Sequence, residues 1–269
     1  MRWFAQQHEV LQALFAAIVA WAMAALGAGL VFPVKRIDRR VLDSMAGFAA
    51  GVMIAVSFWS LLLPAVRVAQ AAERPSVWST LFGFLAGGGV LLLVDKTLPH
   101  LHFGLSRERA EGPQTPWKRS VLLVLATALH NIPEGLAVGI AFGAAAASAP
   151  AATLTGAIAL TAGIALQNVP EGAAVTVPLR RDGMRPARAF WYGQLSGTVE
   201  LAAAVFGAFV VALIPSIAAA ALAFAAGAML FVVIEQLIPQ AQPETHTDLT
   251  TVFTLLGLAA MMLIAFAFG

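Results

Sequence analysis

The sequence contains no cysteine and very little charge. Charged residues make up 11% of its 269 residues and hydrophobic residues 60%, whereas soluble domains carry about 25% charged residues. The absence of cysteine excludes disulfides and thiolate metal sites, so a metal site must use His, carboxylate, amide or thioether groups. The scarcity of charge excludes a soluble domain and leaves a polytopic helical membrane protein.

Positive charge is also too sparse to indicate a nucleic-acid partner. The formal net charge is only +2, although the pI is near 9.5. The basic residues stand in short loops between apolar runs, which is typical of residues that set membrane orientation. We therefore expect a lipid bilayer, and no nucleic acid, as the surroundings of this chain.

Eight apolar runs are each long enough to cross a bilayer, which takes about 20 helical residues. The loops between them are too short to bury a core of their own. The sequence therefore predicts an all-α membrane protein with one transmembrane domain, 1–269. The expected helices are 9–32, 41–66, 77–98, 118–142, 152–178, 188–213, 216–239 and 249–268.

The basic residues gather in alternate loops. Thirteen of the 16 Lys and Arg lie between helices 1 and 2, 3 and 4, or 5 and 6. Cytoplasmic loops carry the excess of Lys and Arg, so these loops are predicted inside and both termini outside. The loop between helices 7 and 8 has no such bias, since it carries Glu244, His246 and Asp248.

One hexapeptide pattern occurs twice, as His-Asn-Ile-Pro-Glu-Gly at 130–135 and Gln-Asn-Val-Pro-Glu-Gly at 167–172. The first and fifth residues of each copy lie four apart and project from one helix face. Each pair of side chains can bind one ion. The proline removes a backbone donor and is expected to kink its helix, an irregularity that membranes tolerate beside a cavity.

Both motifs are expected near the bilayer midplane. His130 lies about 18 Å into helix 4 at 1.5 Å per residue, and Gln167 lies at a similar depth on the antiparallel helix 5. The same count places Met53 and Glu200 at the depth of His130. Met53 alone has the alternative interpretation of an apolar core residue.

Glu134, Glu171 and Glu200 have no Lys or Arg in the middle of any helix to pair with. An isolated charge in an apolar medium is costly, so these carboxylates need protons or a divalent cation. Exchange between the two states would support ion transport. Imidazole, carboxylate and amide donors suit Zn²⁺, Fe²⁺ or Mn²⁺ better than Cu⁺. The alternative interpretation of the motif residues is that they form a hydrogen-bonded contact between helices and bind no ion.

Four further residues stand near the cytoplasmic ends of the helices. Asp95 and Glu235 are either part of an exit path or solvated helix termini. His100 and His102 either collect metal in the loop between helices 3 and 4 or are exposed histidines.

At these residues the sequence resembles the ZIP (Zrt- and Irt-like protein) family of divalent metal transporters, most closely its bacterial GufA-like branch. The resemblance implies eight helices in a 3+2+3 arrangement with an inverted repeat and a metal centre on helices 4 and 5. It implies a main site with Met53 in support, and a second site that shares two glutamates. The implied metal ligands are Met53, His130, Asn131, Glu134, Gln167, Asn168, Glu171 and Glu200.

The resemblance also implies transport into the cytoplasm, with zinc first and iron, manganese or cadmium as other substrates. It implies a homodimer in a bacterial inner membrane and a sliding of helices 1, 4, 5 and 6 against the rest. Many relatives have His at the position of Gln167 and some have Asp at that of Asn168, so this centre has weaker donors.

The alternative function is an intramembrane zinc-dependent hydrolase, since His130, Glu134 and Glu171 could hold a zinc with an open position. The chain lacks a His-Glu-x-x-His pair, which disfavours it. A proton or sodium carrier is a third possibility. We expect no enzyme activity and no cofactor, with metal as the transported substrate.

Overall fold

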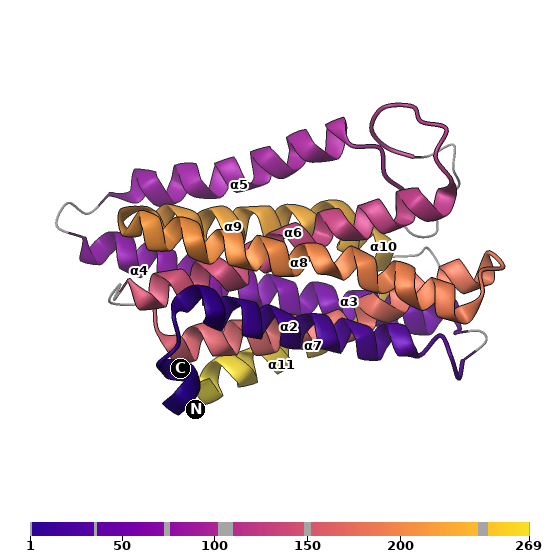
Figure 1. Ribbon diagram of the computed structural model, residues 1–269, viewed down its shortest axis with the longest axis horizontal. Helices are drawn as coiled ribbons and strands as arrows, with labels where there is room; N and C mark the ends of the chain where they lie inside the picture. Colours follow the sequence, from indigo (N-terminus) through magenta and orange to yellow (C-terminus); the bar gives the residue numbers. More distant parts are fainter. Residues whose placement is uncertain are drawn as a thin grey trace.

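The computed structural model describes residues 2–34, 37–72, 76–101, 110–147, 152–241 and 247–268. The described residues are nearly all helical, and their only β-type pairing is an isolated bridge between His100 and Glu111. The long helices lie side by side along the longest axis of the molecule (Figure 1). The predicted all-α architecture is confirmed.

The helices lie close to the expected ranges. A short helix that the sequence analysis did not foresee, α1 (Arg2–Ala5), precedes them. Two π-helical segments, η1 (Val56–Leu62) and η4 (Val233–Leu237), interrupt long helices, and a 3-10 turn, η3 (Pro215–Ile217), precedes α9. The long helices and their continuations are α2 (Glu9–Gly29), α3 (Arg39–Ala55), α4 (Leu63–Ala71), α5 (Val77–Thr97), α6 (Arg119–Ala146), α7 (Leu154–Arg181), α8 (Pro186–Leu213), α9 (Ala218–Val232), α10 (Ile238–Ala241) and α11 (Thr247–Phe268).

Seven helical segments of the described chain are long and apolar enough to cross a membrane. The predicted fifth span, α7, forms a helix of 28 residues but is not among the seven. Its sequence carries glutamine, asparagine, glutamate, threonine and two arginines. The polar residues that make α7 a candidate metal-binding helix thus lower its hydropathy, and the count of eight spans stays a prediction.

Each π-helical segment ends two residues before a proline. Pro64 follows η1, and Pro239 follows η4. A proline inside a helix lacks an N–H and clashes with the carbonyl four residues earlier, and a widened turn relieves that clash. The long helix 39–71 therefore continues to Ala71, past the residue 66 at which we expected it to end.

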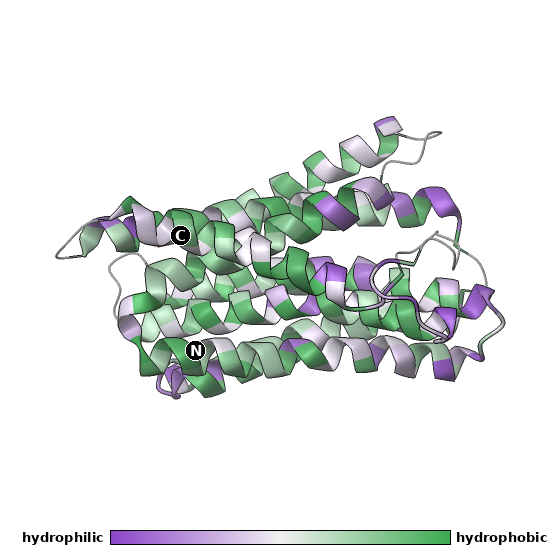
Figure 2. Ribbon diagram, turned by 90° about the horizontal axis from the view of Figure 1, so that it is seen from above, coloured by the Kyte–Doolittle hydropathy of each residue, from purple (hydrophilic) through white to green (hydrophobic). Residues whose placement is uncertain are grey.

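The three basic loops lie at one end of the bundle. Arg180 donates to the backbone oxygens of Val31 and Val34, the latter at 2.9 Å, so the end of α7 is tied to the loop after α2. Arg119 at the start of α6 pairs with Asp182. Hydrophilic segments gather at this end in Figure 2, whereas both termini lie at the opposite end in Figure 1. The three basic loops therefore lie on one side of the bundle, as predicted.

The most extensive helix contacts join α6 with α8, α5 with α9, α2 with α7, and α3 with α11. In each pair, glycine allows the backbones to approach. A Cβ added at Gly139 would lie 2.0 Å from the oxygen of Ala204, and one at Gly51 would lie 1.9 Å from that of Thr254. Small residues allow such approach where lipid supplies no hydrophobic drive for helix association.

Candidate metal centre

The two hexapeptide motifs lie inside α6 and α7. Both helices continue as α-helix through Pro133 and Pro170. The π-helical segments of the described chain lie elsewhere, in η1 and η4, and the expected bend of each helix at its proline stays a prediction. The α-helical turns place the fifth residue of each motif above the first, so each motif presents one polar face.

Direct hydrogen bonds join the polar faces of three helices. The Gln167 amide on α7 donates to Glu134 Oε1 on α6 at 2.6 Å. The Asn168 amide donates to Glu200 Oε2 on α8 at 3.1 Å, and also to the backbone oxygen of Ala20 at 3.1 Å. All four side chains are buried. The structure therefore brings together the residues that the sequence placed at one depth on helices 4, 5 and 6.

Side chains of the predicted site carry buried oxygen atoms that accept no hydrogen bond from any described residue. A buried acceptor without a donor costs free energy, so each such atom calls for a missing partner. Five of these atoms belong to predicted ligands, and three of the five are carboxylate oxygens. They are Glu134 Oε2, Gln167 Oε1, Asn168 Oδ1, Glu171 Oε1 and Glu200 Oε1.

His130 presents one defined ring nitrogen to the site. Its Nδ1 lies 3.0 Å from the backbone oxygen of Ala126. A carbonyl can only accept, so Nδ1 carries a proton, and in the neutral ring Nε2 then holds the lone pair. A backbone carbonyl that fixes the tautomer in this way is the usual outer partner of a metal-binding histidine.

A narrow pocket lies beside His130 and Glu171, on the side of the site that faces the basic loops. Its free volume for water is about 30 Å³, which is room for very few water molecules. Ala46 and Ala49 of α3 and Thr127 of α6 line it, each about two to three turns from the start of its helix. The remaining wall residues are Pro170, Ala174, Val175, Leu237 and Gln240.

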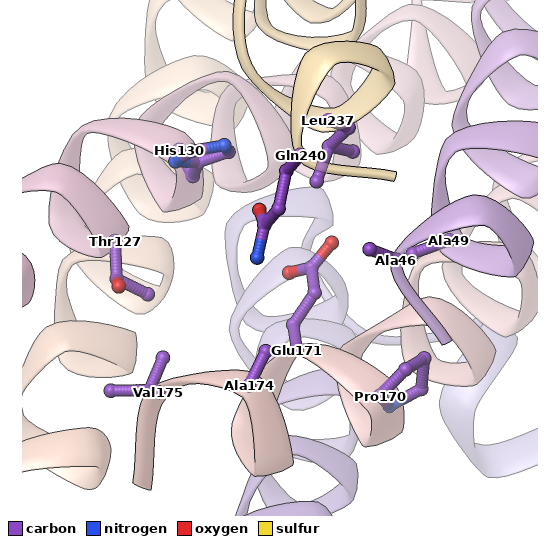
Figure 3. A pocket seen from close by; sticks show the side chains of 10 residues that line it. All are labelled: Ala46, Ala49, Thr127, His130, Pro170, Glu171, Ala174, Val175, Leu237 and Gln240. Atoms are coloured by element: carbon purple, nitrogen blue, oxygen red, sulfur yellow. The ribbon is translucent and has the colours of Figure 1, made fainter. Parts of the chain in front are cut away.

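Gln240 is the pocket residue that the sequence analysis missed. Figure 3 shows its amide pointing toward the Glu171 carboxylate from α10, on the opposite side of the pocket. A glutamine one residue past the end of an expected apolar run, here 216–239, is typically solvated. Only the packing of α10 beside α3 places it at the centre.

Two predicted ligands have structural roles in the described chain. The Asn131 amide donates to the backbone oxygen of Ser196 at 3.0 Å and so joins α6 to α8. Met53 is fully buried in the apolar core on α3. Neither contact tests whether these residues also bind metal, so their part in the site stays a prediction.

The glycine that ends each motif sets the distance between helices. A Cβ at Gly135 would lie 2.2 Å from the backbone oxygen of Glu200, and one at Gly172 would lie 2.1 Å from that of Ala24. Both distances are well inside van der Waals contact. The motif thus supplies polar donors and the close helix packing that brings Glu200 to them.

The central donors do not all converge on one point. Within the described ranges, three His or carboxylate donor atoms lie within 4.8 Å of one another only at Asp95, His100 and Glu111. The central site therefore needs its amide oxygens and small side-chain rotations to surround an ion. Among the outer candidates, Glu235 is exposed beside Asp95, and His102 lies outside the described residues.

Comparison with known proteins agrees with this geometry. Residues 117–265 match the family described as ZIP Zinc transporter. The chain is 39% identical to zinc transporter ZIP11 of Homo sapiens, over 96% of this chain and 97% of that protein. It is 36% identical to zinc transporter GufA of Myxococcus xanthus, over 84% and 87% of the two chains.

A third relative is zinc transporter ZIPB of Bordetella bronchiseptica, which is 35% identical over 96% of this chain and 81% of that protein. The hydrolase alternative finds no support in these matches. They show that the chain belongs to the family of ZIP zinc transporters, and hence that it is a divalent metal transporter and not an enzyme.

Proposed function

We propose that this protein carries zinc across the membrane and into the cytoplasm through the centre on α6, α7 and α8. The observation that carries the proposal is the set of five buried oxygen atoms without donors, all on predicted ligands. A divalent cation satisfies several such oxygens at once, whereas a proton satisfies one. Iron, manganese and cadmium are further candidate substrates because the same donors suit them.

Charge balance supports a cation at this position. Glu134 and Glu200 are buried, and in the part of the chain that the structure describes no Lys or Arg pairs with them or with Glu171. A buried carboxylate without a partner is destabilising. Protons offset that cost before metal arrives, and metal displaces them on binding.

We propose that His130, Glu134, Gln167 and Glu171 form the main site. Asn131, Asn168 and Glu200, with the two shared glutamates, form the second, and Met53 supports the first. The hydrogen bonds Gln167 to Glu134 and Asn168 to Glu200 favour this division because each joins two members of one site.

We infer that the structure represents a state open toward the cytoplasm. The pocket lies on the side of His130 and Glu171 that faces the basic loops, and the charge of those loops favours the cytoplasmic side. Its small free volume requires the ion to shed most of its water. The polar residues of the wall beyond the site, Thr127 and Gln240, therefore act as replacement ligands during exit.

Helix packing supports a sliding mechanism. The helices fall into two groups. The first group is α2, α6, α7 and α8, and the second is α3 to α5 with α9 to α11. The contacts in which an added glycine Cβ would clash with the backbone of a neighbouring helix occur only within each group. Across the groups, Gly163 meets only the side chains of Met261 and Val56. Side chains yield more readily than backbone, so we infer that the first group moves against the second. The matching positions of η1 and η4 before Pro64 and Pro239 favour the inverted repeat.

The homodimer and the bacterial inner membrane are inferred from the family resemblance alone. Crosslinking of the protein in native membranes tests the first. A dimer band that survives dilution of the protein in the membrane supports the homodimer, and its disappearance on dilution contradicts it.

Zinc uptake into proteoliposomes tests the proposed function. Purified protein is reconstituted with a zinc-sensitive dye inside the vesicles, and a panel of divalent ions is added outside. We expect zinc-dependent signal from the wild type, lowered 10- to 100-fold or more in Glu134→Ala and Glu171→Ala, because a charged ligand contributes about 1.5 to 3 kcal/mol. Asp248→Asn, which removes an exposed carboxylate on α11, is the control. Normal uptake by folded Glu134→Ala contradicts the proposal.

A further inference from the structure

Two arginines and a tryptophan lie on the surface at the start of α8, away from the metal centre. Arg185 stands directly before the first residue of the helix, and Arg188 and Trp191 follow it at intervals of three residues. Both arginines are exposed, and Trp191 is 62% exposed. The first turn of α8 lies at the end of the bundle with the basic loops (Figure 1).

Arg188 begins an exposed stripe that runs along the whole of α8. Exposed residues recur every three or four positions, so they lie on one face of the helix. From Trp191 to Leu213 the stripe is about 33 Å long at 1.5 Å per residue, which matches the ~30 Å of a hydrocarbon core. Arg188 lies about one turn before Trp191, and therefore at the level of the lipid headgroups. The largest apolar side chains of the stripe are Trp191, Leu195, Phe206, Phe209 and Leu213.

The aromatic ring of Tyr192 holds the side chain of Arg188. The guanidinium carbon lies 5.6 Å from the centre of the ring, and Nη2 donates to the Tyr192 hydroxyl at 3.4 Å. Tyr192 in turn packs against a buried apolar cluster that includes Leu122 and Leu123 of α6. A guanidinium that already rests on a ring loses less freedom on binding, and its remaining N–H groups can donate to an anion.

The positive charge at this position has no acidic partner. Asp182, in the short connection between α7 and α8, pairs with Arg119 instead. Within the ranges that the structure describes, no carboxylate forms an ion pair with Arg185 or Arg188. The surface therefore favours an anion from outside the chain.

Aromatic rings beside the arginines form an apolar surface. The ring centres of Trp191 and Phe190 are 5.8 Å apart, and those of Phe190 and Phe32 are 5.5 Å apart. Phe32 is 52% exposed, so the aromatic surface extends from α8 to the residues that follow α2. Tryptophan at this depth is typical of the membrane interface. An occupant that fits both parts of the surface has an anionic group attached to an apolar body.

We propose that Arg185 and Arg188 bind the phosphate of an anionic phospholipid, whose acyl chain lies along Trp191 and Leu195. Arginine suits this role because its planar N–H groups can donate two parallel hydrogen bonds to a phosphate. A zwitterionic lipid carries its own cation beside the phosphate and so gains less from two arginines. A soluble phosphate gains nothing from the aromatic surface.

Titration of the purified full-length protein in detergent with dansyl-labelled phosphatidylglycerol tests the site. Energy transfer from tryptophan reports binding, and Trp191→Phe gives the share of Trp191. We expect Arg185→Gln and Arg188→Gln each to raise the Kd about five-fold, and the double variant about 25-fold, because each arginine contributes about one such factor near anionic lipid. Arg67→Gln, which changes an exposed arginine of α4 at the opposite end, should bind as the wild type does.

Competition and a second variant complete the test. Unlabelled phosphatidylglycerol should displace the probe, whereas phosphatidylcholine at the same mole fraction and millimolar inorganic phosphate should not. Arg188→Lys keeps the charge but loses the paired hydrogen bonds, so its Kd should lie between those of the wild type and Arg188→Gln. A wild-type Kd in the double variant with an unchanged Tm overturns the proposal. Equal displacement by phosphatidylcholine, or displacement by inorganic phosphate, also overturns it.

Discussion

Glu200 distinguishes a centre that holds one metal from a centre that holds two. Its Oε2 accepts a hydrogen bond from Asn168 at 3.1 Å, and its Oε1 has no donor among the described residues. Glu200→Gln keeps the size of the side chain, and the glutamine oxygen still accepts from Asn168. The fold should therefore survive, and the change removes one negative charge from the second site.

The magnitude follows from the charge. A carboxylate and a divalent cation about 4 Å apart attract by about 8 kcal/mol at an effective dielectric constant near 20. Desolvation of the carboxylate offsets part of this attraction. We expect a net loss of about 2 to 3 kcal/mol, which is roughly 30- to 150-fold weaker binding of the second ion. The proposed main site at His130, Glu134, Gln167 and Glu171 keeps its own ligands, so transport should continue at a lower rate.

Calorimetric zinc titration of the wild type and Glu200→Gln, beside vesicle uptake, checks this prediction. We expect one fewer ion in the high-affinity phase and measurable uptake. An unchanged number of ions would show that Glu200 is not a ligand. Abolished uptake with one ion still bound would show that it controls passage instead of forming an optional site.

Four further outcomes follow. Gly135→Ala forces α8 away from α6 and should cost about 1 to 3 kcal/mol of stability, which is measured as a lower Tm. Gly29→Ala, where a Cβ meets nothing within 4 Å, should leave the Tm unchanged. An equal Tm in the two variants would refute the packing argument. Gln240→Leu should slow zinc uptake several-fold without unfolding the protein, and Gln70→Leu on α4 should not; equal rates in both remove Gln240 from the exit. Single cysteines at Asp38 and Arg185, in a chain that has none of its own, should resist an impermeant reagent outside whole cells; labelling contradicts the orientation. The raised pKa of the Glu111 carboxyl means that the folded, metal-free protein holds the carboxyl proton more tightly than the unfolded chain does, so the stability of the protein should fall as pH rises through that pKa. Denaturant titration should show no such fall in Glu111→Gln. An identical pH profile of stability in wild type and variant would contradict the attribution of the fall to Glu111.

The helices were predictable because lipid requires long apolar runs, and those runs are visible in the sequence. The helix α7 is the exception. α7 has polar residues on its buried face and is not apolar enough by composition, yet it packs against α2 and α3 within the bundle. The π-helical segments were not predictable, because a proline near the end of a run is equally consistent with a helix that stops there.

The central site was predictable in outline for two reasons. Spacing by four places Glu134 and Glu171 above His130 and Gln167, and counting residues from the helix starts gives their common depth. The hydrogen bond from Asn168 to Glu200 agrees with the predicted depth of helix 6. The ligand roles of Met53 and Asn131 depend on side-chain rotation, which spacing does not determine.

The cluster of Asp95, His100 and Glu111 was only half visible in the sequence. His100 was a candidate for collecting metal and Asp95 a candidate for an exit path, but nothing connected them. Glu111 was missed because it reaches them across a loop, through a backbone bridge that leaves no periodic pattern. His102, the other predicted loop histidine, lies outside the described residues, as do Glu244 and His246.

The location of zinc in the protein tests the central claim most directly. Crystals grown with zinc and measured on both sides of the zinc absorption edge give an anomalous difference map of the metal alone. We predict a peak between α6 and α7, about 2.0 to 2.2 Å from the ligand atoms of His130 and the carboxylate oxygens of Glu134 or Glu171. A map of the zinc-loaded protein with strong peaks elsewhere and none between these helices would contradict the account.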